Sequence, residues 1–383
     1  MIPLSVPYIA GNEWKYIKEC LDTGWVSSAG AYVERFEKMM ADYVGVKHAV
    51  ACVNGTAALH ISLLVAGIKP NDEVLITALT FIAPANAVRY VGAWPVFMDV
   101  KEDTWQMDPE KLIKFLTEEC EEKNDCLFNR ASRRPVTAII PVHILGHSVD
   151  MDPILEIAKL FHLIVIEDAT ESLGVKYKGK KTGTLGDIAC FSFNGNKIIT
   201  TGGGGMIVTD NKECADKARY LTTQAKDDPI EYIHNEVGYN YRLTNIQAAM
   251  GVAQMEKLAD FIDCKRAIAK RYQEGLSDVV GITLSKEASG TYATYWLYTI
   301  LIDKDRYGLS SRELMAELEK EKIQSRPLWH PIHTLKPFND CPSYQVKVVD
   351  KLYRDCLSIP CSVGLTPEDQ AKVIQCIYNK ADA

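Results

Sequence analysis

The first two-thirds of the chain alternate short runs of β-branched and apolar residues with segments of helical pattern. Four of these runs are apolar almost throughout and are predicted to be strands, at residues 73–77, 94–98, 136–140 and 163–166. Strands that are apolar on both faces are typical of parallel sheets, because helices cover both faces of such a sheet. The alternation therefore predicts an α/β fold with a mostly parallel sheet.

Two helices between the strands have recognisable boundaries. Residues 56–66 are apolar on nearly all sides, which predicts a buried helix that ends at Gly67. Thr244 and Gln247 form a capping-box pattern at the start of a second helix. Residues 120–134, by contrast, are dense in charge and lack periodicity, so we predict a surface insertion there.

The pattern changes after about residue 260. A long helix over residues 265–276 leads into a strand over 296–302, and a capped helix is predicted from Ser311. A last helix opens around Pro367, since proline is favoured in the first helical turn. This order of elements predicts a smaller α+β domain at the C-terminus.

The length of the chain agrees with this division, because 383 residues are enough for two domains that share a cleft. We predict a large domain over residues 1–260, which includes the N-terminal segment, and a small domain over residues 261–383.

Composition excludes several classes of function. The net charge is −7, and no stripe of lysine and arginine is present, which argues against a nucleic-acid partner. The first residues lack a signal-peptide pattern, and runs such as 137–145 are too short to span a membrane. The eleven cysteines include no Cys-x-x-Cys pair, which favours reduced thiols over a metal site or disulfides. We therefore expect a cytoplasmic protein without a bound metal.

Four local features suggest a phosphorylated cofactor. The fourth of them, residues 238–243 just before the capped helix, has an ordinary loop that leads into the helix as its alternative. Residues 50–59 read as a strand, a turn of small residues and a helix start, which is a favourable seat for a phosphate group. An ordinary strand–helix turn with Thr56 as N-cap is the alternative. Asp168 ends a predicted parallel strand, at the edge where α/β folds bind ligands. It could hold a protonated pyridine nitrogen, or be an N-cap or ion-paired residue.

The third feature is Lys197, which lies between a predicted strand and the glycine run 202–205. It is flanked by apolar Ile198 and Ile199, so it is not a typical surface lysine. Partial burial would lower its pKa and leave a free amine for a Schiff base. The glycines do not match a dinucleotide-binding pattern, because no suitable strand–helix–strand unit surrounds them.

Together, these residues resemble the DegT/DnrJ/EryC1/StrS sugar aminotransferases, which have fold type I of the pyridoxal-phosphate enzymes. The resemblance covers nearly the whole chain. It is carried by motifs at residues 24–30, 54–59, 80–83, 143–146, 167–169, 191–193 with Lys197 five residues after Ser192, and 238–242.

The resemblance implies pyridoxal 5′-phosphate as cofactor, with pyridoxamine 5′-phosphate as its second form, and assigns roles to residues. Lys197 would form the Schiff base and then move a proton, and Asp168 would hold the pyridine nitrogen. Glu171 would lie near the ring oxygen. Phe81 would stack on the ring. The phosphate would be bound by Gly55, Thr56 and Ser192, and by Asn240 from the partner subunit of a homodimer with shared active sites. Asn54, Thr170 and Gly203 depart from the residues often found at those positions.

Residues 193–201 and 326–329 are most similar to a subgroup that aminates C4 of UDP-linked 4-keto-6-deoxy-N-acetylhexosamines. Substrate contacts are therefore expected from Ser27, Arg326, Trp329 and His330. Arg326 suits a diphosphate, although a surface ion pair is the alternative. Trp329 and His330 could line the same pocket or pack the small domain.

The predicted function is therefore transfer of an amino group from L-glutamate to C4 of a nucleotide-linked 4-keto-6-deoxy sugar, with UDP-2-acetamido-2,6-dideoxy-4-ketohexose as the first candidate. One alternative is a GDP-linked ketosugar, GDP-4-keto-6-deoxymannose, as in perosamine synthesis. The other is a non-catalytic sensor that keeps the fold, which the presence of Lys197 and Asp168 disfavours.

Overall fold

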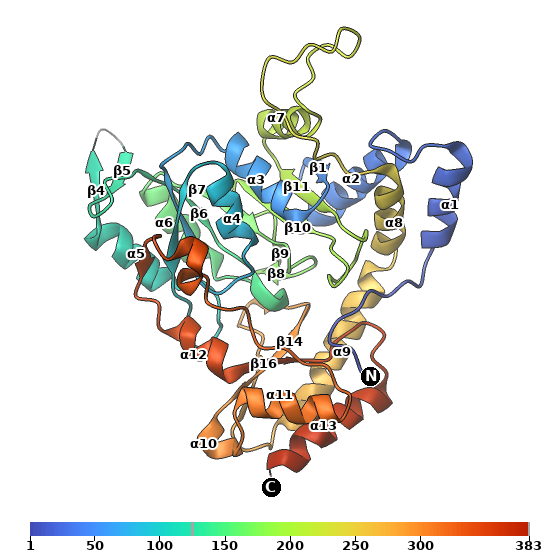
Figure 1. Ribbon diagram of the computed structural model, residues 1–383, viewed down its shortest axis with the longest axis vertical. Coiled ribbons are helices and arrows are strands. Elements are labelled where there is room, and N and C mark those ends of the chain that lie inside the picture. Colours follow the sequence, from blue (N-terminus) through green and yellow to red (C-terminus); the bar gives the residue numbers. More distant parts are fainter. Residues whose placement is uncertain (124–125, 382–383) are drawn as a thin grey trace.

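The computed structural model describes residues 1–123 and 126–381 (Figure 1). Its centre is an eight-stranded sheet in the order β1-β11-β10-β7-β6-β2-β3-β15, in which β11 runs antiparallel to its two neighbours and the remaining pairs are parallel. The strands are β1 (His48–Cys52), β2 (Glu73–Thr77), β3 (Trp94–Met98), β6 (Val136–Ile140), β7 (Ile164–Asp168), β10 (Ile188–Ser192), β11 (Gly205–Thr209) and β15 (Ser343–Tyr344).

Helices cover this sheet, which confirms the predicted α/β architecture. They are α1 (Glu13–Thr23), α2 (Ala31–Val44), α3 (Gly55–Val65), α4 (Ala83–Tyr90), α5 (Pro109–Glu118), α6 (Met151–Leu160), α7 (Lys212–Thr222) and α8 (Asn245–Met255). The predicted strands at 73–77, 94–98 and 136–140 are confirmed with the same bounds, and the fourth, predicted over 163–166, begins one residue later and ends two residues later, at 164–168. They are almost wholly buried, because helices lie on both faces of the sheet.

The helix predicted over 56–66 begins one residue earlier, at Gly55. Its N-cap is Asn54, whose side chain accepts a hydrogen bond from the Ala57 N–H group, so the alternative with Thr56 as N-cap is wrong. The second boundary is confirmed, since Thr244 and Gln247 form a complete capping box at the start of α8.

The charged segment 120–134, predicted as a surface insertion, contains regular structure that its sequence pattern did not indicate. It contains a hairpin of β4 (Cys120–Lys123) and β5 (Cys126–Asn129), and residues 124–125 between them lie outside the described residues. Cys120 and Asn129 are buried, and the Asn129 amide donates to the Glu73 carboxylate at the base of β2. The charged side chains lie on the outer positions of a two-stranded ribbon. Because of them, the sequence lacks the alternation of apolar and polar residues that would predict strands.

The C-terminal third contributes a second, smaller sheet in the order β12-β14-β16 (lower half of Figure 1). Its strands are β12 (Ile282–Leu284), β14 (Tyr298–Ile302) and β16 (Cys356–Ile359), and its helices are α9 (Leu258–Leu276), α10 (Lys304–Tyr307), α11 (Ser311–Lys320), α12 (Val348–Asp355) and α13 (Pro367–Ala381). A third sheet, β13-β8-β9, joins Thr291–Tyr292 to Lys176–Tyr177 and Lys180–Lys181.

Two predicted bounds in this part are wrong. The helix expected from residue 265 begins at Leu258, and the strand expected from 296 begins at Tyr298. Trp296 instead lies in an irregular segment that leads into β14. The domain boundary at 260/261 stays a prediction, although the second sheet and α11 and α13 all follow it in the chain.

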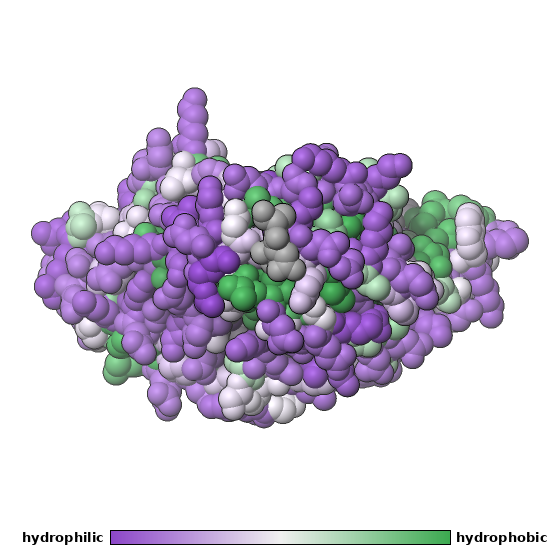
Figure 2. Space-filling model, turned by 90° about the horizontal axis from the view of Figure 1, so that it is seen from below, coloured by the Kyte–Doolittle hydropathy of each residue, from purple (hydrophilic) through white to green (hydrophobic). Residues whose placement is uncertain are grey.

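The face formed by the C-terminal elements is mostly hydrophilic, and apolar side chains gather at the end of the molecule where α1 lies (Figures 1 and 2). Among the described residues, no helix is long and apolar enough to cross a membrane.

Candidate active site

Asp168 is the last residue of β7, at the carboxyl edge of the parallel strands. It is 2% exposed, and its carboxylate accepts a hydrogen bond from the Thr170 N–H group at 3.1 Å. Burial raises the pKa of Asp168, while Thr170 and the nearby Lys197 oppose that rise. A buried carboxylate with so few donors is available for a cationic partner.

Glu167, the preceding residue, faces the other side of the sheet and makes a different set of contacts. Its carboxylate accepts hydrogen bonds from the backbone N–H groups of Gly183, Leu185 and Gly186, and it lies 3.0 Å from the His143 ring nitrogen. These four contacts satisfy both oxygens of the Glu167 carboxylate. Glu167 therefore fixes the turn before β10 and takes no part in the site.

The N-terminus of α3 lies beside the end of β10. A Cβ atom on Gly55 would approach the Cβ of Ser192 to 2.9 Å, so glycine permits this close approach. Gly55, Thr56 and Ser192 then face one cavity. The positive end of the helix dipole and a hydroxyl group make this position suitable for a phosphate.

Lys197 lies in the irregular segment between β10 and β11, and its side chain is 12% exposed. Its Nζ atom is 3.6 Å from the Glu171 carboxylate and 3.8 Å from the centroid of the Trp296 ring. Burial lowers the pKa of Lys197, although Glu171 and Asp168 oppose this effect. The amine is thus closer to its neutral, nucleophilic form than a surface lysine is.

Glu171 is the second buried carboxylate at the site, with 3% of its side chain exposed. It accepts a hydrogen bond from the Leu145 N–H group at 2.9 Å. Burial raises the pKa of Glu171 to about 7, with Lys197 and the Leu145 N–H group acting against it. Glu171 can therefore exchange a proton near neutral pH beside the amine of Lys197.

These groups open into one cavity of about 670 Å³ between the large sheet and the C-terminal elements. The structure brings nine of the predicted site residues to its wall: Gly55, Thr56, Phe81, Asp168, Glu171, Ser192, Lys197, Arg326 and Trp329. Arg326 takes part in none of the ion pairs formed by the described residues, so its guanidinium is available to an anionic ligand.

Three predicted site residues lie away from the cavity wall of the single chain. Ser27 is exposed, and its carbonyl accepts from the Asn245 N–H group. Asn240 is exposed and bridges Thr223 in a short antiparallel contact. His330 contacts the Thr334 hydroxyl and packs on the Tyr353 ring. Their assigned roles stay predictions.

Sequence reasoning missed several residues that line the cavity: Leu4, Ser5, Trp296, Leu297, Gln324 and Ser358. They come from the N-terminal segment and from loops and strands of the C-terminal part. No local motif marks them, because only the tertiary fold brings them to the site. Trp296 alone carried a signal, as an aromatic residue at the predicted start of a strand.

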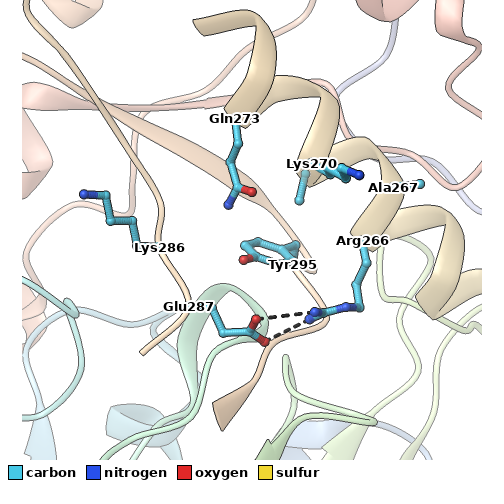
Figure 3. Close-up of a pocket in the computed structure, with 8 residues that line it drawn as sticks. Arg266, Ala267, Lys270, Gln273, Lys286, Glu287 and Tyr295 are labelled. Carbon is cyan, nitrogen blue, oxygen red and sulfur yellow. Dashed lines mark hydrogen bonds and ion pairs between the residues drawn. The ribbon is translucent and has the colours of Figure 1, made fainter. Parts of the chain in front are cut away.

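A second cavity, of about 580 Å³, lies along α9 (Figure 3). Its main polar groups already have partners, since Arg266 is paired with Glu287 at 2.9 Å and Lys270 lies 3.7 Å from Glu274. Lys197 and Asp168 are not among the residues that line it. The chemistry of the molecule therefore belongs to the first cavity.

The first cavity fits pyridoxal phosphate by the chemistry of its side chains. It combines a buried amine, a buried carboxylate at a strand end, an exposed aromatic ring on Phe81 and a helix N-terminus with a hydroxyl group. These correspond in turn to the aldehyde, the pyridine nitrogen, the ring face and the phosphate of that cofactor.

The fold and the cavity define a pyridoxal-phosphate-dependent transferase. The sequence pattern of the DegT/DnrJ/EryC1/StrS aminotransferase family matches residues 7–378, and the chain belongs to this family. It is a sugar aminotransferase.

Individual relatives agree with this assignment. The chain is 42% identical to the GDP-perosamine synthase of Caulobacter vibrioides, over 97% of this chain and 96% of that protein. It is 38% identical to EpsN of Bacillus subtilis, a putative pyridoxal phosphate-dependent aminotransferase, over 99% and 95%. A solved DegT DnrJ EryC1 StrS aminotransferase from Brucella abortus superposes with a TM-score of 0.89 at 30% identity, covering 97% of this chain and 96% of that one.

The contact between Glu171 and Lys197 predicts a pH effect. In the unloaded protein, Glu171→Gln removes the negative charge that favours the ammonium form of Lys197, but keeps an oxygen for the Leu145 N–H group. We expect the pH midpoint for attachment of pyridoxal phosphate to fall, and the rate below that midpoint to rise roughly tenfold. The measurement is the attachment rate, followed by absorbance across pH. An unchanged or higher midpoint would show that Glu171 does not control this amine.

Proposed function

We propose that the protein transfers an amino group from L-glutamate to C4 of GDP-4-keto-6-deoxymannose. Three relatives named as GDP-perosamine synthases, 42%, 41% and 36% identical to this chain, support GDP as the nucleotide. The UDP-linked sugar was the first candidate from the sequence, and these relatives favour the GDP-linked alternative instead. The observation that carries the proposal is the single cavity that joins Lys197 and Asp168 to the free guanidinium of Arg326.

Pyridoxal phosphate, when bound, supplies a ring that stabilises negative charge on the carbon that loses its proton. Asp168 would favour this by keeping a positive charge on the ring nitrogen. Lys197 would hold the cofactor and, once released, move a proton at the sugar carbon, with Glu171 adjusting its protonation from 3.6 Å away. The N-terminus of α3 and Ser192 would bind the phosphate.

Substrate recognition is assigned to the outer part of the cavity. Arg326 offers a planar fork of N–H donors, which suits the diphosphate of a nucleotide sugar. Trp329 lies nearly parallel to Trp296, at an interplanar angle of 11° and 6.3 Å between ring centroids. These rings would form an apolar wall for the sugar or the base.

We also propose a cytoplasmic homodimer in which Asn240 serves the partner's site. In the single chain, Asn240 is exposed and bridges Thr223. The segment between them, residues 224–239, projects beyond α7 (Figure 1). Apolar side chains on this segment and on α1 are exposed, including Ile230 at 82%, Val237 at 81% and Trp14 at 81%. Such exposed apolar groups support burial against a second copy of the chain.

The nucleotide can be tested with a half-reaction. The enzyme is loaded in the amino form of its cofactor, ketosugars linked to GDP or UDP are offered separately, and the absorbance of the aldehyde form is followed. We expect the GDP-ketosugar to restore it, at least tenfold faster than the UDP-ketosugar, with GDP and UDP alone as controls. A faster reaction with the UDP-linked sugar would reverse the proposed specificity, and no reaction with either would contradict the function.

The shared site can be tested by mixing two inactive variants, Lys197→Ala and Asn240→Asp. The aspartate places a negative charge where Asn240 would meet the cofactor phosphate, which weakens binding. If Asn240 serves the partner, one site of each heterodimer carries both changes and the other carries none. We expect up to half of the wild-type activity per heterodimer. No recovery, once subunit exchange is confirmed by mass spectrometry, would assign Asn240 to its own subunit.

A further inference from the structure

The peptide that precedes Lys197 is held by two side chains from distant parts of the sequence. The Asn196 carbonyl accepts a hydrogen bond from the Trp296 indole N–H at 2.7 Å and from the Ser5 hydroxyl at 3.0 Å. Asn196 lies in an irregular segment, so its carbonyl has no partner from a strand ladder. Both donors were absent from the residues that the sequence marked for the site.

Trp296 is itself fixed at its backbone. It is 4% exposed, and its carbonyl accepts from the Nζ atom of Lys265 at 2.7 Å and from the Cys361 thiol at 3.5 Å. Lys265 is a buried lysine of α9, 3% exposed, without an ion pair among the described residues. A buried amine needs hydrogen-bond partners, and here carbonyl groups provide them. These hydrogen bonds hold the carbonyl groups in place.

The residues before Trp296 are held as well. Arg266, the next residue of α9, donates to the Ala293 carbonyl at 2.6 Å and pairs with Glu287, which accepts from the Ala293 N–H group (Figure 3 shows the pair). Gly146 also packs closely against this segment. Its φ is 82°, and a Cβ atom at Gly146 would lie 2.3 Å from the backbone nitrogen of Trp296. The segment that carries Trp296 therefore has little freedom to move.

Ser5 is brought to Asn196 by the same group of residues. The Leu4 carbonyl accepts from the Cys361 N–H group at 2.8 Å, and the Leu4 N–H group donates to the Gln324 side chain at 3.0 Å. Lys265 also donates to the Cys361 carbonyl at 2.5 Å. One buried lysine thus ties together the two segments that deliver the two donors.

We propose that Trp296 and Ser5 are positioning residues for Lys197, which fix the Asn196–Lys197 peptide through the shared Asn196 carbonyl and so aim the amine into the cavity. The proposal rests on the proposed role of Lys197 as the residue that binds the cofactor. Through Ser5, the N-terminal segment would then help to position Lys197 at the active site.

The test measures how fast the unloaded protein attaches pyridoxal phosphate covalently, which needs no substrate and no turnover. Trp296→Phe keeps an aromatic ring near Lys197 but removes the indole N–H group, and Ser5→Ala removes only the hydroxyl. We expect attachment to slow by roughly tenfold for Trp296→Phe and by about threefold for Ser5→Ala, the size expected for single hydrogen bonds. In the double variant, the attachment rate should fall by more than the product of the two single fold reductions, because the Asn196 carbonyl then loses both donors.

Trp105→Phe is the matched control, because Trp105 is 7% exposed, lies outside the cavity of Lys197 and donates no indole hydrogen bond to the described residues. Melting temperatures of all variants are measured alongside. If Trp296→Phe and Ser5→Ala attach the cofactor within twofold of the control, or if their effects simply multiply, the positioning role is overturned. If the wild-type protein attaches no cofactor, the proposed function fails with it.

Discussion

Replacing Lys197 by alanine is expected to abolish amino transfer while the fold remains intact. The side chain lies in a cavity and is not part of the hydrophobic core, and among the described residues its one ion pair is with Glu171. If Lys197 is the proposed attachment point and proton carrier, its removal should lower turnover by at least about 10⁴-fold. The measurement is the steady-state rate, together with the melting temperature.

Lys180→Ala provides the matched control, since Lys180 is an exposed lysine of β9 outside the cavity. It should keep wild-type rates. Activity above about a tenth of the wild-type value in Lys197→Ala would show that another residue carries the reaction.

Asp168→Asn should keep the fold and the cofactor but lower the rate by about 10²- to 10³-fold. The amide has nearly the same shape and can still accept from the Thr170 N–H group, so packing changes little. It cannot, however, stabilise a positive charge on the ring nitrogen, and charge stabilisation of this kind is usually a large contribution to catalysis. The measurement is the turnover number with the cofactor content verified.

The neighbouring carboxylate separates this effect from a general loss of charge. Glu167→Gln should act on stability, because Glu167 accepts from three backbone N–H groups in the turn before β10. We expect it to lower the melting temperature while the remaining folded protein stays active. Wild-type turnover in Asp168→Asn, or equal behaviour of the two variants, would contradict the assigned division of roles.

The parts of the fold that could be predicted from the sequence are those in which local pattern and burial agree. The strands at 73–77, 94–98 and 136–140 are apolar almost throughout because helices cover both sheet faces. The hairpin at 120–129 was missed, since its charged outer residues gave no alternation. The early start of α9 was missed because Leu258 follows closely on the end of α8, without a capping signal.

The site residues also fall into two groups, those that local motifs mark and those that only long-range contacts bring to the cavity. Asp168 ends β7, the α3 turn follows β1, and Lys197 follows the end of β10 by five residues. Short motifs identify all three, and the structure brings them into one cavity. Trp296 and Ser5 reach that cavity only through contacts that span 100 and 191 residues. Contacts between residues so far apart in the sequence produce no local motif from which they could be predicted. For the nucleotide, motifs and relatives disagree, because short motifs favoured UDP whereas two of the relatives aligned over nearly the full length are named GDP-perosamine synthases.

The lysine that binds the cofactor can be identified directly. The enzyme is loaded with pyridoxal phosphate, reduced with borohydride, digested, and mapped by mass spectrometry. We expect one labelled peptide, modified at Lys197, and no label in Lys197→Ala. A label on Lys180, Lys181 or the buried Lys265, with Lys197 unmodified, would contradict the role proposed for Lys197.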